Sequence, residues 1–289
     1  MRVLALLDGT LVGPDRPLLR ADDLGVLRGD GVFETVLVVN GRPRKLAAHL
    51  ERLARSAAML DLPAPDPADW QRCVAAACAA WEWPDEMALK LVLTRGPDGG
   101  MDPEGEGFGG SGPAAVTGYA FGARVPEITL RQRREGVAVL TLDRGYPAGL
   151  GERAPWLLIG AKSLSYATNM AAIRYAQAHG ADDAVYVSTD GWVLEAPTAS
   201  VIVASGRDLR TPPVGAGLLP GTTQRQLFRA VEAAGWTAKT EPLRVSDLLA
   251  ADGVWLLSSI RQLAAVHTID GTPRPVPPEL DAELRGLLG

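Results

Sequence analysis

Hairpin turn signals alternate with helical periodicity along this chain, and that mixture is what most restricts its fold. Asp8-Gly9, Asn40-Gly41 and Asp190-Gly191 each stand beside runs rich in apolar and β-branched residues, the pattern of strands joined by tight turns. Residues 46–60 instead repeat leucine and alanine at the spacing of an amphipathic helix. Because hairpins and helices follow one another without regular βαβ units, we predict an α+β fold with two domains.

The same signals divide the chain into elements and domains. We predict strands at residues 32–39, 87–94, 115–121, 137–142, 183–188, 192–196 and 201–204, helices at residues 46–60, 70–80, 163–178 and 222–234, and a final hairpin over residues 253–269. Residues 96–113 are rich in glycine and proline and cannot pack a core, which predicts a loop. We place a smaller N-terminal α+β domain at residues 1–122, a linker at residues 123–126, and a larger C-terminal domain carrying Lys162 at residues 127–289.

Composition and charge argue against several classes of protein. The chain has 289 residues, 47% of them hydrophobic and 22% charged, which is typical of a globular protein with an ordinary core. Its net charge of −5 argues against nucleic-acid binding, and no apolar stretch approaches the roughly 20 residues of a membrane span. The N-terminus has no small-residue cleavage site, and Cys73 and Cys78 are expected to be buried free thiols, so we expect a cytoplasmic protein. His49, His179 and His267 are scattered, which predicts no metal site.

Lys162 stands out because the chain uses arginine at nearly all its other basic positions. The four lysines are Lys45, Lys90, Lys162 and Lys239, and Lys162 directly follows the apolar run of residues 156–161. Arginine keeps its proton, whereas a partly desolvated lysine can lose it and act as a nucleophile or base. The alternative is a lysine whose stem lies on apolar surface while its amine reaches water.

Three further stretches carry chemistry that would complement a reactive amine. Glu195 lies at the end of a predicted strand, Thr222 and Thr223 follow Gly221 at a predicted helix start, and Arg52 lies on a predicted helix. The amides of a helix start bind anions, although each stretch has a plainer interpretation as a helix cap or a solvated side chain. Together, a lysine, a carboxylate, an arginine and an anion-binding helix start fit a cofactor with an aldehyde, a protonatable ring and a phosphate. Pyridoxal phosphate has all three.

The order and spacing of these motifs resemble the fold-type IV pyridoxal-phosphate enzymes, which include branched-chain aminotransferases, D-amino-acid aminotransferases and 4-amino-4-deoxychorismate lyases. The resemblance covers almost the whole chain and depends on the set of motifs, since each motif is weak alone. The motifs are RGDGVFET at residues 28–35, HxxRLxxS at residues 49–56, KSL at residues 162–164, Glu195-Ala196 with Ser200, PGTT at residues 220–223, and Ser258-Ser259.

This resemblance implies a role for each candidate residue. Lys162 would form a Schiff base with the cofactor and, once displaced by the substrate amine, would move protons. Glu195 would keep the pyridine nitrogen protonated. The phosphate would be held by Arg52, the backbone amides of Thr222 and Thr223, and the hydroxyl of Ser259. Family members are usually homodimers, with the cofactor between the two domains.

The subgroup is indicated by three segments. Residues 27–35, the KSLSY form at residues 162–166 and the ending at residues 258–261 look most like aminodeoxychorismate lyase. We therefore expect the chain to convert 4-amino-4-deoxychorismate into 4-aminobenzoate and pyruvate, a step of folate biosynthesis. A D-amino-acid or branched-chain aminotransferase would use the same lysine. A non-catalytic small-molecule binder on the same fold is a third hypothesis, but it would not need a Schiff-base lysine.

Some positions depart from the family pattern and leave the substrate open. Asparagine is frequent in the family where Ser165 and Ser200 stand here, and Gln224 takes the place of an arginine that usually follows PGTT. Residues 99–102 lack the Arg-Gly-Tyr that binds a substrate carboxylate in some lyases. The remaining candidates for substrate carboxylates, each of which would alternatively form an internal ion pair, are Arg28, Arg95 and Arg261.

Overall fold

The computed structural model describes residues 2–98 and 116–288. Its contacts divide the chain into two compact units: a first unit of Met1–Val125 with Ala161–Tyr166, and a second unit of Pro126–Gly160 with Ala167–Gly289. Each unit combines one sheet with helices, so the predicted α+β class is confirmed. The contact pattern differs from the predicted domains in two respects: the first unit extends to Val125, into the predicted linker, and it includes the Lys162 segment.

The first unit is built on a six-stranded antiparallel sheet in the order β2-β1-β6-β5-β3-β4. Its strands are β1 (Arg2–Leu6), β2 (Leu11–Val12), β3 (Gly31–Val39), β4 (Arg42–Pro43), β5 (Met87–Thr94) and β6 (Thr117–Arg124). The predicted hairpin turn at Asn40-Gly41 is confirmed, since both residues have positive φ, at 50° and 71°. Strand β6 extends through Arg124, so it includes half of the predicted linker.

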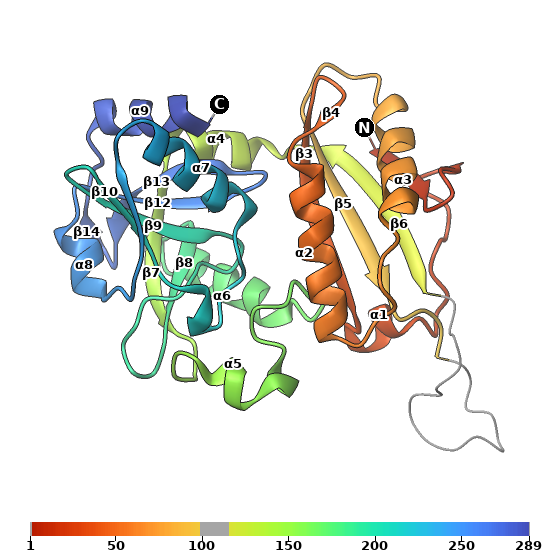
Figure 1. The fold of residues 1–289 in the computed structure, drawn as a ribbon, viewed down its shortest axis with the longest axis horizontal. Coiled ribbons are helices and arrows are strands. Elements are labelled where there is room, and N and C mark those ends of the chain that lie inside the picture. Colours follow the sequence, from red (N-terminus) through yellow and green to blue (C-terminus); the bar gives the residue numbers. More distant parts are fainter. Residues whose placement is uncertain (1, 99–115, 289) are drawn as a thin grey trace. The chain divides into compact units, whose positions relative to one another are not determined.

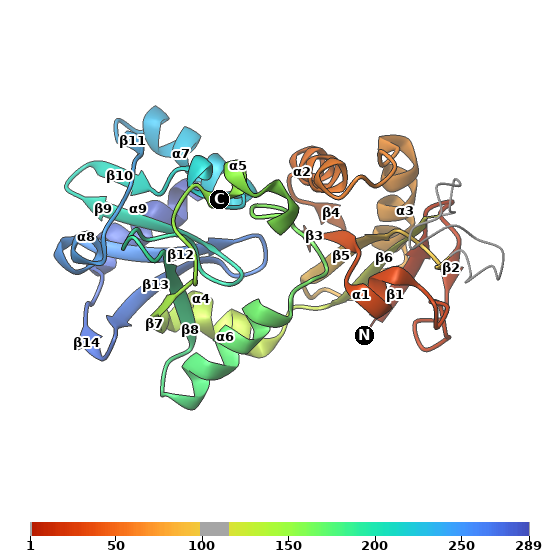
Figure 2. The ribbon, with the colours of Figure 1, turned by 90° about the horizontal axis from the view of Figure 1, so that it is seen from below.

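Helices cover one face of this sheet. They are α2 (Leu46–Met59) and α3 (Pro67–Ala79), which pack on β3 and on β1 and β6 respectively, and a short α1 (Leu24–Arg28) precedes β3. Figures 1 and 2 show α2 and α3 on the same side of the strands. Pro67 begins α3 behind the N-cap Asp66, which accepts a hydrogen bond from Ala68, because proline suits the first turn of a helix.

The second unit is built on a mixed eight-stranded sheet in the order β11-β10-β9-β12-β13-β7-β8, with β14 paired to β13. Its strands are β7 (Val137–Asp143), β8 (Asp183–Val187), β9 (Ser200–Ser205), β10 (Asp208–Thr211), β11 (Thr237–Thr240), β12 (Gly253–Ser258), β13 (Gln262–Ile269) and β14 (Thr272–Pro273). Its helices are α4 (Glu127–Glu135), α5 (Leu150–Arg153), α6 (Ala167–Ala178), α7 (Thr222–Ala233), α8 (Val245–Ala250) and α9 (Pro278–Leu288), with single 3-10 turns at Pro155–Leu157 and Val214–Ala216.

Both faces of the central strands β9 and β12 are buried, in two separate core clusters. Ile202 and Trp255 pack in one cluster with Leu227 of α7, whereas Val203 and Leu256 pack in the other with α8. Neighbouring residues of a strand point to opposite faces, so these continuous apolar runs supply both clusters. The sheet thereby fixes the ends of β9 and β12, where Ser200 and Ser258 lie.

Two predicted elements differ from the structure. The predicted helix at residues 163–178 begins only at Ala167, because Ser163 forms a β-bridge with Val32 and its segment is bonded to β3. Residues 192–196 do not form the predicted strand; Val193 and Ala196 make isolated bridges instead. The predicted loop at residues 96–113 lies mostly outside the described residues.

Several features bear on classes of function. Cys73 and Cys78 are free, the first buried and the second half-buried, and burial raises the pKa of both thiols to about 11. Across residues 2–98 and 116–288, no helix is long and apolar enough to cross a membrane. Within the same ranges, His, Cys, Asp and Glu side chains nowhere gather in a group that could hold a metal ion.

Candidate active site

Lys162 lies on a short segment that runs along the edge of β3, at the end that β4 does not cover. The backbone N–H of Phe33 donates to the Lys162 carbonyl at 3.0 Å, and that of Leu164 donates to the Gly31 carbonyl at 2.8 Å. The Lys162 N–H donates in turn to Ser56 Oγ of α2, at 3.1 Å. Because β4 pairs only with the far end of β3, the near end is open to this segment. The backbone of Lys162 is therefore held by both the sheet and a helix.

The amine of Lys162 lies against aromatic rings. Its Nζ is 4.4 Å from the centre of the Phe33 ring and 5.9 Å from that of Tyr166. The two rings meet edge to face at 5.3 Å, and Lys162 is half-buried. This half-buried environment fits both interpretations of Lys162, a partly desolvated amine and a lysine stem lying on apolar surface.

Glu34 of β3 and two side chains of α2 form a buried polar cluster. Glu34 is fully buried; its Oε1 accepts from Arg52 Nε at 2.6 Å, and its Oε2 accepts from Arg52 Nη2 at 2.8 Å and His49 Nδ1 at 2.7 Å. Burial alone would raise the pKa of Glu34, but hydrogen bonds from Arg52 and His49 outweigh it and lower that pKa to about 2. Burial lowers the pKa of His49, although the hydrogen bond to Glu34 opposes this shift. Arg55, one helical turn from Arg52, is by contrast exposed.

In the second unit, Glu195 lies beside the loop before α7. Its Oε2 accepts from the Leu219 N–H at 3.3 Å, and its carbonyl accepts from the Tyr186 N–H at 2.9 Å. The side chain is half-buried, so the plainer interpretation of a fully solvated glutamate does not hold.

The start of α7 contains a buried hydroxyl without a partner. Gly221 is the N-cap, and no side chain caps the helix. A Cβ on Gly221 would overlap Ser200 Oγ, so glycine is required for this close approach. Thr223 is 2% exposed, and its Oγ1 is buried without a hydrogen-bond partner. Buried polar groups are normally paired, so this hydroxyl has unused hydrogen-bonding capacity at a helix start, where anions commonly bind.

Ser259 lies directly after β12 and close to the start of α7. Its Oγ lies 3.4 Å from Oγ1 of Thr222. The turn that carries Ser259 is held by Arg261, whose N–H donates to Ser258 Oγ at 3.1 Å and whose guanidinium pairs with buried Asp183 at 2.7 Å. The three hydroxyls of Thr222, Thr223 and Ser259 thus belong to two structural elements fixed by the same sheet.

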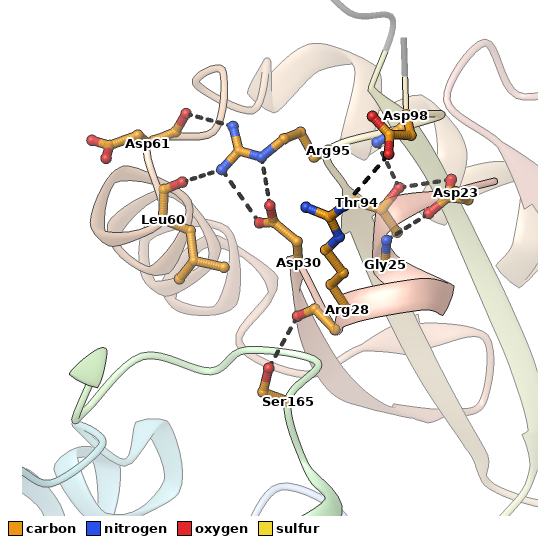
Figure 3. A network of polar contacts seen from close by, with 12 residues as sticks. Asp23, Gly25, Arg28, Asp30, Leu60, Asp61, Thr94, Arg95, Asp98 and Ser165 are labelled. Carbon is orange, nitrogen blue, oxygen red and sulfur yellow. Dashed lines mark hydrogen bonds and ion pairs between the residues drawn. The ribbon is translucent and has the colours of Figure 1, made fainter. Parts of the chain in front are cut away.

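The three arginines expected at substrate carboxylates all form internal ion pairs, the alternative that the sequence left open. Figure 3 shows Arg95 with Asp30, at 2.6 Å, and with the Leu60 carbonyl, and it shows Arg28 facing Asp98 at 3.6 Å. The third, Arg261, makes the buried pair described above. Substrate binding by these arginines stays a prediction. Residues 99–102, which lack the family's arginine motif, lie outside the described residues.

The sequence reasoning missed Glu34 and Ser56. Glu34 is an acidic residue in the middle of a β-branched strand, a position that predicts burial with a partner. His49, Arg52 and Ser56 recur at helical spacing, so a buried polar face of α2 was readable from the sequence.

Comparisons with known proteins show the family to which the chain belongs. Residues 31–269 match the family model described as amino-transferase class IV. The chain is 44% identical over 293 residues to a bifunctional aminodeoxychorismate lyase / D-amino acid transaminase of Mycobacterium tuberculosis, covering 98% of this chain and 97% of that protein. A hypothetical aminotransferase of the same organism, solved in a PLP-bound form, superposes with a TM-score of 0.93 at 43% identity, covering 100% of this chain and 97% of the other. Its form with α-ketoglutarate and PMP gives a TM-score of 0.92 at 44% identity, covering 99% and 98% of the two chains.

Proposed function

Because the chain belongs to the class IV aminotransferase family, we propose that it is a pyridoxal-phosphate enzyme that converts 4-amino-4-deoxychorismate into 4-aminobenzoate and pyruvate. Binding of the cofactor is supported by the buried, unpaired hydroxyl of Thr223 at a helix start without a side-chain cap, which suits a phosphate. The choice of substrate is supported by the 44% identity, over nearly the whole chain, to a relative named for this lyase activity.

The residues present fit the chemical groups of this cofactor. Lys162 offers the amine for its aldehyde and Glu195 a carboxylate for its ring nitrogen. The phosphate would be held by Arg52, the start of α7 at Thr222 and Thr223, and Ser259. When bound, pyridoxal phosphate supplies an electron sink for the carbon next to the substrate nitrogen.

In this reaction Lys162 would act as the proton carrier. Its amine, once released by the substrate amine, would remove the proton from the amine-bearing carbon of 4-amino-4-deoxychorismate. The ether bond at the neighbouring carbon then breaks, and the enolpyruvyl group leaves and takes up a proton to become pyruvate. The ring becomes aromatic, which supplies a large driving force. The protein's task is therefore to position the substrate and to hold or move one proton.

D-amino-acid transamination is the second candidate. The 44% identical relative is named for both activities, and the structure with α-ketoglutarate and PMP is described as an aminotransferase. Lys162 would serve here too, returning the proton to the cofactor instead of allowing a group to leave. Branched-chain amino acids are a further substrate class for the same lysine. A non-catalytic binder is the remaining hypothesis.

A paired assay of the cofactor-loaded protein tests these activities, with Lys162→Ala as the control. One arm supplies 4-amino-4-deoxychorismate and follows 4-aminobenzoate; the other supplies D-alanine with 2-oxoglutarate and follows glutamate. We expect product in the first arm, reduced by several orders of magnitude in the variant. Turnover in the second arm alone would replace the lyase with a transaminase. A colourless protein that takes up no cofactor would favour the binder.

We also propose that the protein is a homodimer, as the resemblance implies. Trp156 and Leu157 are 74% and 49% exposed, and neighbouring apolar side chains of this size favour a protein contact. Light scattering of the eluted protein should give twice the mass of 30.5 kDa. A value equal to the chain mass would contradict the proposal.

A further inference from the structure

We infer that Ser56 is a positioning residue for Lys162, and that its hydroxyl fixes the lysine backbone relative to Arg52. The inference rests on the proposed function, in which Lys162 binds the aldehyde and Arg52 the phosphate of one cofactor. It concerns a contact between α2 and the lysine segment, both of which belong to the first unit.

One face of α2 buries polar side chains where apolar ones would be expected. His49, Arg52 and Ser56 are 1%, 5% and 2% exposed, and they recur at positions that share one side of a helix. A buried polar group destabilises the fold unless it is hydrogen-bonded. His49 and Arg52 meet Glu34, whereas Ser56 meets the backbone N–H of Lys162. The serine therefore has a different task from its two neighbours.

The contact holds the part of Lys162 that the sheet does not hold. The lysine carbonyl accepts from Phe33 on β3, but the lysine N–H points to α2 and donates to Ser56. Without the Ser56 hydroxyl, β3 alone would hold the backbone of Lys162. In Ser56→Ala the lysine N–H would face a buried methyl group. Loss of a buried partner costs more than the net value of the hydrogen bond, because the remaining donor stays unsatisfied.

Ser56 and Arg52 are one helical turn apart, which couples the two ends of the proposed site. Four residues of an α-helix span about 6 Å along its axis, and the helix resists changes in that spacing. The guanidinium of Arg52 is itself fixed by two hydrogen bonds to Glu34. Helix α2 thus sets the separation between the arginine and the backbone of the lysine, which is the preorganisation that a covalently held cofactor requires.

The test measures cofactor binding in two backgrounds, because a positioning role must act through the lysine amine. With intact Lys162, we expect Ser56→Ala to weaken pyridoxal-phosphate binding about tenfold, the effect of one buried hydrogen bond, and to lower the fraction trapped on Lys162 by borohydride. With Lys162→Ala in place, adding Ser56→Ala should leave the dissociation constant unchanged. An equal loss of affinity in both backgrounds would show a general packing effect and overturn the inference.

Two more variants separate hydrogen bonding from folding. Ser56→Cys keeps the volume but offers only a weak acceptor, so it should bind the cofactor as poorly as Ser56→Ala. Ser188→Ala is the matched control: Ser188 is a serine of the second unit, 3% exposed, whose Oγ accepts from the Trp192 N–H at 2.9 Å. It should lower the melting temperature of the cofactor-free protein and leave affinity unchanged. Wild-type affinity in both Ser56 variants would overturn the inference.

The outcome for the wild-type protein distinguishes the two proposals. If wild-type protein traps no cofactor on Lys162, the proposed function fails. If it does trap cofactor and Ser56→Ala does so equally well, only the role of Ser56 fails.

Discussion

At the scale of single residues, the buried carboxylate of Glu34 makes an acid-sensitive contact. Its pKa falls from 4.5 to about 2, so its contribution to stability is complete above pH 4.5 and is lost as the pH falls towards 2. The lowered pKa of His49 acts in the same direction, because below pH 6.5 the unfolded chain takes up a proton that the folded ring resists. We expect Glu34→Gln to cost roughly 3 kcal/mol at pH 7, since it removes the negative charge that pairs with the buried guanidinium of Arg52. Denaturant unfolding should show a smaller loss of stability in this variant than in wild type between pH 4.5 and 2. Parallel pH curves for the two proteins would contradict this account.

At the scale of elements, the start of α7 predicts two effects of opposite sign. Thr223→Val replaces an unpaired buried hydroxyl with a methyl group of similar size, so the cofactor-free protein should melt at the same or a higher temperature. The same change should weaken pyridoxal-phosphate binding about tenfold if that hydroxyl meets the phosphate. Thr211→Val is the matched control, because the Thr211 hydroxyl already donates to the Val201 carbonyl at 2.8 Å, and its loss should lower the melting temperature without a change in affinity. A destabilised cofactor-free Thr223→Val protein would show that the hydroxyl has a protein partner.

The elements also show how far the sequence could be interpreted. Local signals were sufficient for β3, β5, α2 and α7, whose bounds agree with the predictions to within one residue, because periodicity and turn residues specify them. They failed at residues 163–166, where pairing with β3, far away in the sequence, overrides the helical pattern. The candidate residues Lys162, Glu195, Arg52 and Thr223 were recognisable from their motifs. The partners of Arg28, Arg95 and Arg261 were not, since an ion pair depends on which segments the fold brings together.

At the scale of the whole molecule, the proposed cofactor ligands are spread along the sequence from Arg52 to Ser259. Binding to the folded state alone should raise the free energy of unfolding by about 2.7 kcal/mol when free cofactor is at 100 times its dissociation constant. We expect hydrogen exchange to slow in the Lys162 segment and at the start of α7 when pyridoxal phosphate is added. In Lys162→Ala the protection at the start of α7 should persist in part, while that of the lysine segment should be lost. Protection of only one of these two segments in the wild-type protein would contradict the proposed set of ligands.

The first unit is discontinuous in sequence: its segment Ala161–Tyr166 follows Pro126–Gly160, which belongs to the second unit. During synthesis Met1–Val125 leaves the ribosome before residues 161–166. Until those residues emerge, the edge of β3 lacks its pairing segment and Ser56 of α2 lacks the Lys162 N–H that it accepts from. We expect an N-terminal fragment ending at Val125 to be more prone to proteolysis and edge-to-edge association than the full chain, because it lacks the segment that pairs with β3. Exchange of the first unit for another by gene fusion at that boundary should therefore disrupt the site, because Lys162 and the strand edge that holds its backbone are encoded in different stretches of the gene.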